Sequence, residues 1–260
     1  MKSVELKKLY AEIGQSIHSM NTIAVSLSIM PDENVKVPDT LQISWSPRNI
    51  SFSKRVSRSY AERSAVVYAT ESFFEYLDNI SKNNFWKHDK ITFQGNEKKA
   101  DKVFIFLKQI PELQEYEIIL AELLCHWRNK IVHLKASPTL IKKKIRTLRD
   151  NKDHIYQHIH HFDVDLALEH FDQNTITLKD ASTLITIALK CAESIDNFFI
   201  SEMAAIGSSE LLQKFLIDMN FKRIYNQPNV ERRQTQLKLW ISTNYPYFTD
   251  RRLDTIVKEL

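Results

Sequence analysis

Three side chains suited to acid–base chemistry beside a phosphate lie close together near the middle of the chain. They are Arg128, Asn129 and His133, in the run Arg-Asn-Lys-Ile-Val-His. An imidazole titrates near neutral pH and can therefore accept or donate a proton. A guanidinium stays charged and presents a planar fork of donors to phosphate oxygens. The carboxamide of Asn129 can hold either the imidazole or the phosphate.

The element expected to position these side chains is a helix over 113–134, closed by Pro138. On a helical wheel, with about 100° per residue, the sector from Arg128 to His133 lies opposite the apolar stripe. Asn129 and His133 are four residues apart and are therefore neighbours on one face. We expect the three polar groups to converge on the side that faces away from the core, where their substitution leaves no core cavity. The stripe consists of Tyr116, Leu120, Leu123, Leu124, Trp127, Ile131 and Leu134.

Glycine is scarce, with three residues in a chain of 260. Gly14, Gly95 and Gly207 are too far apart to form a GxGxxG or GxxxxGK[ST] loop, so nucleotide-binding enzymes of those types are excluded. Sheets and hairpins also draw on glycine, whereas long helices need little. The hydrophobic fraction of 43% is typical of a globular chain with a real core. The predicted fold class is therefore all-α.

Helical spacing of the apolar residues divides the chain into long helices separated by polar or proline-containing segments. Residues 34–51, with Pro38 and Pro47 among β-branched and aromatic residues, are expected to form a short extended excursion. Residues 161–174 are polar and are expected to be less regular. The expected helices cover 2–30, 53–81, 100–110, 113–134, 139–160 and 178–204, with two or three shorter helices in 208–260.

Charge and cysteine content favour a cytoplasmic protein. The net charge of +4 is compatible with a nucleic-acid partner. Cys125 and Cys191 both lie within apolar helical patterns and are expected to be reduced, packed thiols. The charged, amphipathic N-terminal residues do not resemble a secretory signal. The longest nearly apolar stretch, 23–30, is too short to span a bilayer, so we expect no membrane partner.

The run from Arg128 to His133 resembles the R-x4-6-H motif of the HEPN superfamily, with a polar residue directly after the arginine. Its context is similar too, because the motif ends an apolar helix, follows a long helical hairpin and precedes another long helix. The resemblance implies a multi-helix HEPN-like bundle with additional N- and C-terminal helices. We expect this domain to occupy 1–204, with its core at about 53–135 and 178–204, and a C-terminal helical extension to occupy 205–260.

The resemblance also implies an activity. Many members of the superfamily are metal-independent endoribonucleases, often toxins or antiviral defence effectors, whose site forms between two protomers. Arg128, Asn129 and His133 would then be the catalytic residues, and we expect no cofactor or metal. Attack by the ribose 2′-OH needs a base and an acid on opposite sides, which a two-fold homodimer would supply from one histidine per chain. The toxin branch with an adenylylated tyrosine two residues after the histidine does not match, because that position is Lys135.

Two carboxylates on the expected helix over 53–81 could support the motif. Glu71 and Glu75 lie one turn apart on an element that is expected to pack beside the motif helix. Either carboxylate could orient Arg128 or His133. The alternative is that both are ordinary surface carboxylates, which most glutamates are.

The expected helix over 139–160 carries two unusual groups. Its basic run could guide an RNA backbone toward the motif, or it could be a solvated helix face. His154 and His158 have the spacing with which a helix grips zinc, but no further ligands accompany them, which favours a solvated, pH-sensitive segment. The basic run consists of Lys142, Lys143, Lys144 and Arg146, followed by Arg149.

Three hypotheses about function follow. The first is an RNA endonuclease that acts as a homodimer, with RNA as its substrate and an antitoxin or regulatory protein as a candidate partner. The second is a catalytically inactive HEPN module that binds RNA, a nucleotide or a partner protein. The third is a helical interaction protein in which the motif is a coincidence. Cleavage of RNA separates the first from the second, and the position of the motif relative to a second copy separates both from the third.

Overall fold

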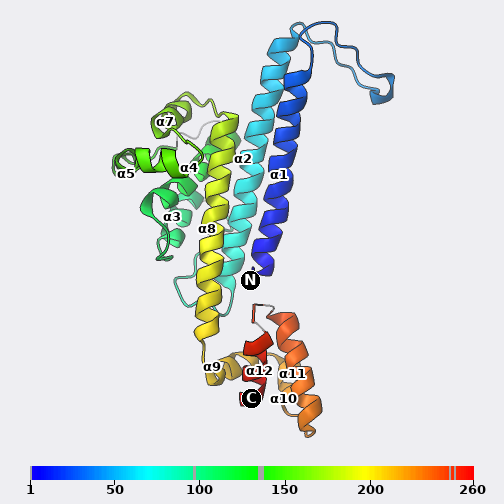
Figure 1. Cartoon of the computed structure of the whole chain (residues 1–260), viewed down its shortest axis with the longest axis vertical. Coiled ribbons are helices and arrows are strands. Elements are labelled where there is room, and N and C mark those ends of the chain that lie inside the picture. Colours follow the sequence, from blue (N-terminus) through cyan, green and yellow to red (C-terminus); the bar gives the residue numbers. More distant parts are fainter. Residues whose placement is uncertain (1, 96–97, 134–137, 246, 249) are drawn as a thin grey trace.

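The computed structural model describes residues 2–95, 98–133, 138–245, 247–248 and 250–260. Within these ranges all regular structure is helical and no residue belongs to a strand, which confirms the all-α fold class. Figure 1 shows three long helices side by side, a group of shorter helices on one flank, and a second group below them.

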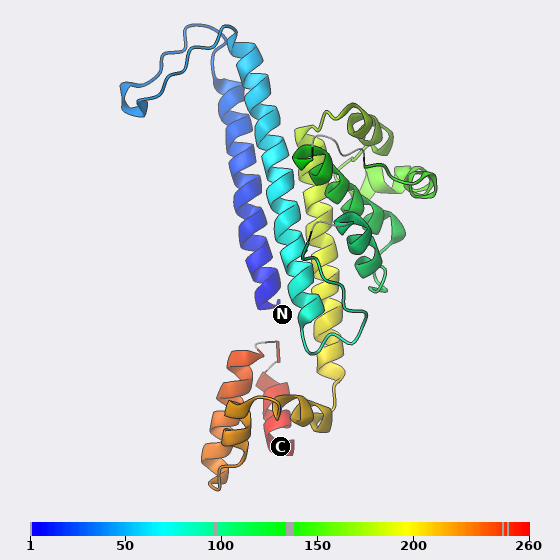
Figure 2. The same ribbon diagram turned by 180° about the vertical axis from the view of Figure 1, so that it is seen from behind.

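Two of the long helices, α1 (Val4–Ile29) and α2 (Ile50–Lys82), form a hairpin that extends beyond the rest of the molecule, as Figures 1 and 2 show. Each begins at a polar cap whose side-chain oxygen accepts a hydrogen bond from the backbone N–H three residues later. The distance is 2.9 Å at Ser3 and 2.8 Å at Asn49. The apolar face of α1 is buried against α2 through Leu6, Leu9, Ile13 and Met20.

The connection between α1 and α2 is an exposed excursion that contains no strand. Its only regular element is a single 3₁₀ turn, η1 (Asp39–Leu41). Most of its residues are exposed, so water can satisfy their backbone groups in place of a neighbouring strand. The foot of the connection is anchored by Lys54, whose Nζ donates to the carbonyl oxygen of Met30 at 2.7 Å and to Asp32 Oδ1 at 2.9 Å.

The third long helix and the flanking helices enclose the helix that carries the motif. That helix, α4, packs against α2, α3, α5 and α8. The apolar residues of these elements belong to one continuous core. Their bounds are α3 (Lys99–Leu107), α4 (Glu115–Val132), α5 (Lys142–Asp150), α6 (Lys152–His158), α7 (Val164–Gln173) and α8 (Leu178–Ala205).

Because it is enclosed in this way, α4 has no solvent face over most of its length. Every residue from Tyr116 to Cys125 is buried, including two glutamates. Glu117 forms an ion pair with Lys190 at 2.5 Å, and Glu122 forms one with Lys144 at 2.6 Å. The wheel correctly separates an apolar stripe from a polar sector, but the expectation that this sector faces away from the core holds only in the last turn.

The segment after the motif is more regular than expected. Residues 139–160 contain two helices, α5 and α6, which meet at Asn151. Residues 161–174 contain a complete helix, α7, so the expectation of irregular structure there is wrong. Asp163 Oδ1 accepts from the N–H of Leu166 at 3.0 Å and begins this helix. Its apolar residues lie three and four apart and are buried, namely Val164, Ala167, Leu168 and Phe171.

The C-terminal helices pack against the lower ends of α2 and α8 (Figure 1). The ring of Phe85, just after α2, lies edge-on to Phe215 and to Tyr245, with centroids 6.3 and 5.2 Å away. Phe199 in α8 meets Tyr247 in the same way at 5.8 Å. Aromatic contacts therefore join residues 205–260 to the bundle. The helices are α9 (Ser208–Phe215), α10 (Met219–Tyr225), α11 (Val230–Asn244) and α12 (Asp250–Glu259).

Four of the described helices have the length needed to span a bilayer but not the composition. The helices α1, α2, α4 and α8 contain 26, 33, 18 and 28 residues. Across the described ranges, no helix combines that length with sufficient apolar character to cross a membrane.

Both cysteines are packed in the core. Cys125 in α4 and Cys191 in α8 are free thiols and are completely buried. Burial raises the pKa of both thiols well above the ordinary value, because the charged thiolate loses its hydration. Neither cysteine therefore has the properties of a nucleophile.

Candidate functional site

The three motif side chains meet at the C-terminal end of α4. Arg128 donates from Nη1 to Asn129 Oδ1 at 3.2 Å, and the same nitrogen lies 3.3 Å from His133 Nε2. Because a guanidinium can only donate, this contact requires His133 Nε2 to act as an acceptor. One nitrogen of Arg128 therefore links the amide and the imidazole.

His133 ends the helix, and its position has two consequences. Its backbone N–H donates to the carbonyl oxygen of Asn129 at 3.0 Å, which keeps the two residues one turn apart, as the spacing predicts. Its side chain is exposed, so the helix holds the backbone of His133 while the imidazole ring stays accessible. Leu134 and Lys135 lie outside the described residues.

A carboxylate from α2 completes the group. Glu71 Oε1 lies 2.5 Å from Arg128 Nη2, and its other oxygen lies 3.5 Å from Lys99 Nζ. The structure therefore brings Glu71 to Arg128, and the orienting role of Glu71 stays a prediction. The carboxylate faces two cations, which leaves the group with a net positive charge. Lys99 also lies 4.8 Å from the centre of the Phe74 ring, and its side chain is only 14% exposed.

Arg128 is less accessible than the sequence predicts. Its side chain is 13% exposed, and its Nε is buried with no hydrogen-bond partner among the described residues. The expectation that Arg128 lies wholly off the packed side of the helix is wrong, because α2 covers this side and supplies Glu71. Replacing Arg128 with alanine would therefore remove packed atoms and an ion pair as well as a charge.

Glu75 lies away from the motif. Its Oε1 forms an ion pair with Lys8 Nζ of α1 at 2.6 Å, and both side chains are 54% exposed. The two glutamates therefore point to different neighbours of α2, with Glu71 toward α4 and Glu75 toward α1. Of the two carboxylates, the structure brings only Glu71 to the motif.

The basic run after the motif divides into exposed and engaged residues. Lys142 and Lys143 are exposed. Lys144 pairs with the buried Glu122, and its Nζ lies 3.6 Å from the centre of the Phe104 ring. Arg146 is 83% exposed and lies 3.7 Å from Asp150. RNA binding by this run stays a prediction, and Lys144 already holds a structural partner.

The histidine pair in α6 is stacked. The rings of His154 and His158 have centroids 4.1 Å apart, and His158 Nδ1 lies 2.9 Å from the backbone oxygen of His154. In the described part of the chain, no three His, Cys, Asp or Glu side chains gather so that they could hold a metal ion.

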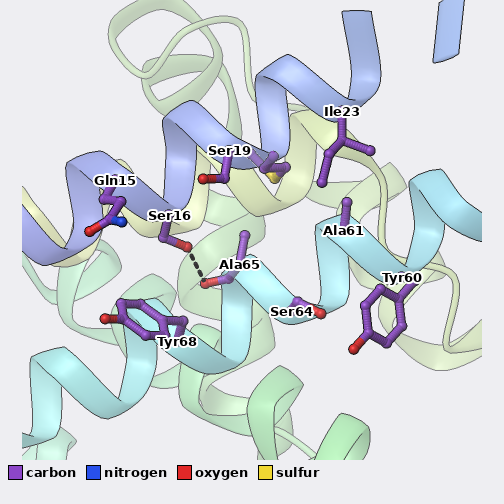
Figure 3. Close-up of a pocket in the computed structure, with 10 residues that line it drawn as sticks. Gln15, Ser16, Ser19, Ile23, Tyr60, Ala61, Ser64, Ala65 and Tyr68 are labelled. Carbon is purple, nitrogen blue, oxygen red and sulfur yellow. Dashed lines mark hydrogen bonds between the residues drawn. The ribbon is translucent and has the colours of Figure 1, made fainter. Parts of the chain in front are cut away.

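Two hollows lie beside the α2 surface that carries Glu71. One has a volume of about 560 Å³ and is lined by Glu71 and Lys99. The other, of about 300 Å³, is the groove between α1 and α2 in Figure 3, where Ser16 Oγ lies 3.5 Å from the carbonyl oxygen of Ala65. Tyr68, which is 52% exposed, lines both hollows. Glu71, the carboxylate that pairs with Arg128, therefore adjoins space into which a ligand could extend.

Comparison of this chain with protein-family models, curated proteins and solved structures finds no match. The function therefore rests on the geometry of the site and on the resemblance of its motif.

The sequence did not single out two groups that the structure brings to notice. Lys99, the second partner of Glu71, opens a helix far from the motif in sequence, and its pairing depends on tertiary packing. His170 and Asp180 form the second group, with Nδ1 and Oδ2 2.8 Å apart. The sequence signal for this second pair is the Thr177-x-x-Asp180 spacing of a helix-capping box, which predicts a helix start but not the histidine beside it.

Proposed function

We propose that the protein is a metal-independent endoribonuclease of the HEPN type, which cleaves RNA by attack of the 2′-OH and acts as a toxin or antiviral defence effector. The observation that carries the proposal is the double contact of Arg128 Nη1 with Asn129 and with His133 Nε2. It supports a site in which a permanent positive charge and a proton acceptor stand side by side, beside an accessible surface.

Each group has a distinct part in the proposed reaction. His133 takes the proton from the ribose 2′-OH, and the oxygen then attacks the adjacent phosphorus. The phosphorane gains a negative charge, which Arg128 stabilises through its donors. The bond from phosphorus to the 5′-oxygen breaks, and a protonated imidazole supplies the proton to that oxygen. The products are a 2′,3′-cyclic phosphate and a 5′-hydroxyl.

The base and the acid must lie on opposite sides of the phosphorus. One chain offers one motif histidine, so the proposal includes a two-fold homodimer in which the second His133 is the acid. Val132, next to the histidine, is 42% exposed. An exposed apolar side chain beside the polar group is consistent with a surface that a second copy covers.

A second candidate function is RNA binding without cleavage. The close pairing of Arg128 with Glu71 favours it, because a neutralised guanidinium stabilises a phosphorane less well. In this case the chain would retain RNA affinity and would leave the RNA intact.

The deciding experiment is cleavage of single-stranded RNA by the purified chain in the presence of a chelator. We expect 2′,3′-cyclic or 3′-phosphate ends and no cleavage of DNA, because DNA lacks the attacking hydroxyl. His133→Ala should lower the rate by about 10²- to 10⁴-fold, which is typical of a positioned acid or base. The matched control is His18→Ala, since His18 is an exposed histidine of α1 and should not affect the rate.

Arg128 is better tested with lysine than with alanine. Arg128→Lys keeps the charge and most of the packed stem beside Glu71 but loses the planar fork. We expect a rate about 10²-fold lower with the fold retained. Cleavage that requires magnesium, or that survives His133→Ala, would overturn the mechanism. Binding of RNA by a chain that cleaves none would establish the second candidate.

A further inference from the structure

A further hollow, separate from the motif, lies between the upper half of α2 and the turn from α7 to α8. Its volume is about 700 Å³, and we call it the α2–α8 pocket. Three arginines of α2 line it, namely Arg55, Arg58 and Arg63, together with the start of α8 at Leu178. The pocket therefore concentrates positive charge on one wall.

The three guanidinium groups keep most of their donors available. Arg58 uses Nε to bind Glu62 Oε1 at 3.2 Å, and its side chain is 47% exposed. Arg63 uses one Nη2 donor for the carbonyl oxygen of Asn174 at 2.6 Å. Arg55 is exposed, and its guanidinium carbon lies 5.4 Å from the centre of the Phe52 ring. Each arginine offers five N–H donors, so these contacts use only a few of the donors on the three residues that line the pocket.

The pocket already holds one anionic group. Glu62 is 5% exposed and lines the pocket, and Arg58 Nε donates to its Oε1 at 3.2 Å. Burial raises the pKa of Glu62, while the Arg58 guanidinium opposes that change. Arg58 is therefore the arginine that holds this carboxylate. Arg55 and Arg63 are not used by it.

An exposed aromatic ring continues the same wall. Phe52, Arg55, Ser59 and Arg63 follow one another at helical spacing of three and four, so they form one stripe along α2. Phe52 is 56% exposed at the upper end of this stripe. Arginines in line with an exposed aromatic ring match the way proteins hold single-stranded nucleic acid, with phosphates on the cations and a base stacked on the ring.

The pocket adjoins the motif through two connections. Lys130, inside the motif, donates to the carbonyl oxygen of Phe171 and lies 3.9 Å from the centre of its ring, and Phe171 is three residues before Asn174. Along α2, Arg63 and Glu71 are eight residues apart, which corresponds to about 12 Å of helix. A bound strand could therefore extend from the pocket to Arg128.

We infer that the α2–α8 pocket binds the phosphate backbone of single-stranded RNA, with Arg55 and Arg63 on the phosphates and Phe52 under a base. This inference rests on the proposed function, because it assigns to the same RNA a binding site beside the cleavage site. A free nucleotide also carries a phosphate that these arginines could bind, and the test below distinguishes an RNA strand from a free nucleotide.

The test measures binding in the His133→Ala chain, so that the RNA stays intact. The probe is a labelled single-stranded RNA oligonucleotide, titrated at several salt concentrations. The double change Arg55→Gln and Arg63→Gln should weaken binding about 10-fold and should lower the slope of log affinity against log salt by about 1.4, at about 0.7 for each lost contact on a single strand. Phe52→Ala should weaken binding about 5-fold or more.

The matched control is Arg223→Gln with Arg232→Gln, which removes the same charge from exposed arginines of the C-terminal helices. Equal effects of the control and of the pocket change, on affinity and on slope, would overturn the inference. Arg55→Gln alone is the variant to use if the double change does not fold, because Arg55 is exposed. Displacement of the RNA by equimolar AMP would assign the pocket to a nucleotide and would also overturn it.

Failure here is distinguishable from failure of the proposed function. A chain that binds RNA through Arg55 and Arg63 but cuts none supports the pocket and refutes the nuclease. A chain that cuts RNA while the pocket change binds like the control supports the nuclease and refutes the pocket.

Discussion

Glu71 and Glu75 provide a matched pair for testing the site. They are the same residue type, one turn apart on α2, and each forms an ion pair. Glu71 holds Arg128, whereas Glu75 holds Lys8. Replacing each with glutamine removes one negative charge with almost no change in shape. A difference between the two variants therefore reports on the partner rather than on the carboxylate.

The cost in stability should differ between the two variants. Glu75 and Lys8 are both 54% exposed, so solvent screens their ion pair, and we expect Glu75→Gln to change the free energy of unfolding by at most about 1 kcal/mol. The Oε1 atom of Glu71 is buried, and the side chains of its partners Arg128 and Lys99 are only 13% and 14% exposed. We expect Glu71→Gln to lower the free energy of unfolding by about 1–3 kcal/mol, because two poorly solvated cations lose their anion.

The effect on catalysis should differ. Without its carboxylate partner, Arg128 is no longer held against α2, and we expect kcat for RNA cleavage to fall about 10-fold in Glu71→Gln, on the order of one charged hydrogen bond. KM should not rise, because the guanidinium loses a competing anion and attracts RNA at least as well. Glu75→Gln should leave kcat and KM unchanged.

The assay is steady-state cleavage of a fluorescent RNA, with thermal unfolding of each variant measured in parallel. Equal kcat values for the Glu71 and Glu75 variants would refute the positioning role of Glu71. A rise in kcat for Glu71→Gln would also refute that role, and would show instead that the carboxylate restrains Arg128.

Three further outcomes are expected. The chain should be a dimer at micromolar concentration by light scattering, and Val132→Asp should reduce dimer content and cleavage together; a monomer that cleaves RNA would contradict the composite site. Lys144→Gln should lower the free energy of unfolding by about 3 kcal/mol, because Glu122 is 1% exposed and would lose its ion pair, whereas Lys142→Gln should have no effect on thermal unfolding. Burial raises the pKa of Asp196 above its ordinary value of 3.8, so the folded chain favours the neutral carboxyl. The stability contributed by this neutral form is complete below pH 3.8 and is lost as the pH rises through the raised pKa. Asp196→Asn should therefore raise the unfolding free energy at pH 7 and reduce its decline with pH in urea titrations.

The sequence predicts what depends on short-range spacing. The all-α class, the helix that carries the motif and the proximity of Asn129 and His133 all follow from helical periodicity, because residues four apart on a helix are neighbours whatever surrounds them. The same periodicity places Glu71 and Glu75 one turn apart. It does not determine which of them faces Arg128, because that depends on how α2 rotates against α4.

The features that the sequence does not reveal arise from packing between distant segments. A wheel gives α4 one polar side, yet Glu117 and Glu122 are buried because lysines from α8 and α5 reach them. The helix in 161–174 is an exception, because its capping Asp163 and the three- and four-residue spacing of its buried apolar residues are local signals that the polar composition outweighed. The α2–α8 pocket joins arginines of α2 to a turn more than a hundred residues later, and no local pattern links them.

The uninterrupted length of α2 limits how related sequences can differ in length. One helix carries the arginine stripe and Glu71 and leads directly to the aromatic contact at Phe85. Each residue added to a helix advances it by about 1.5 Å and turns it by about 100°. A single insertion between Arg63 and Glu71 would therefore swing one group away from the other, with no loop in between to absorb it. Natural insertions and deletions, and engineered tags, should be tolerated at the connection over 30–49 and excluded from 55–85.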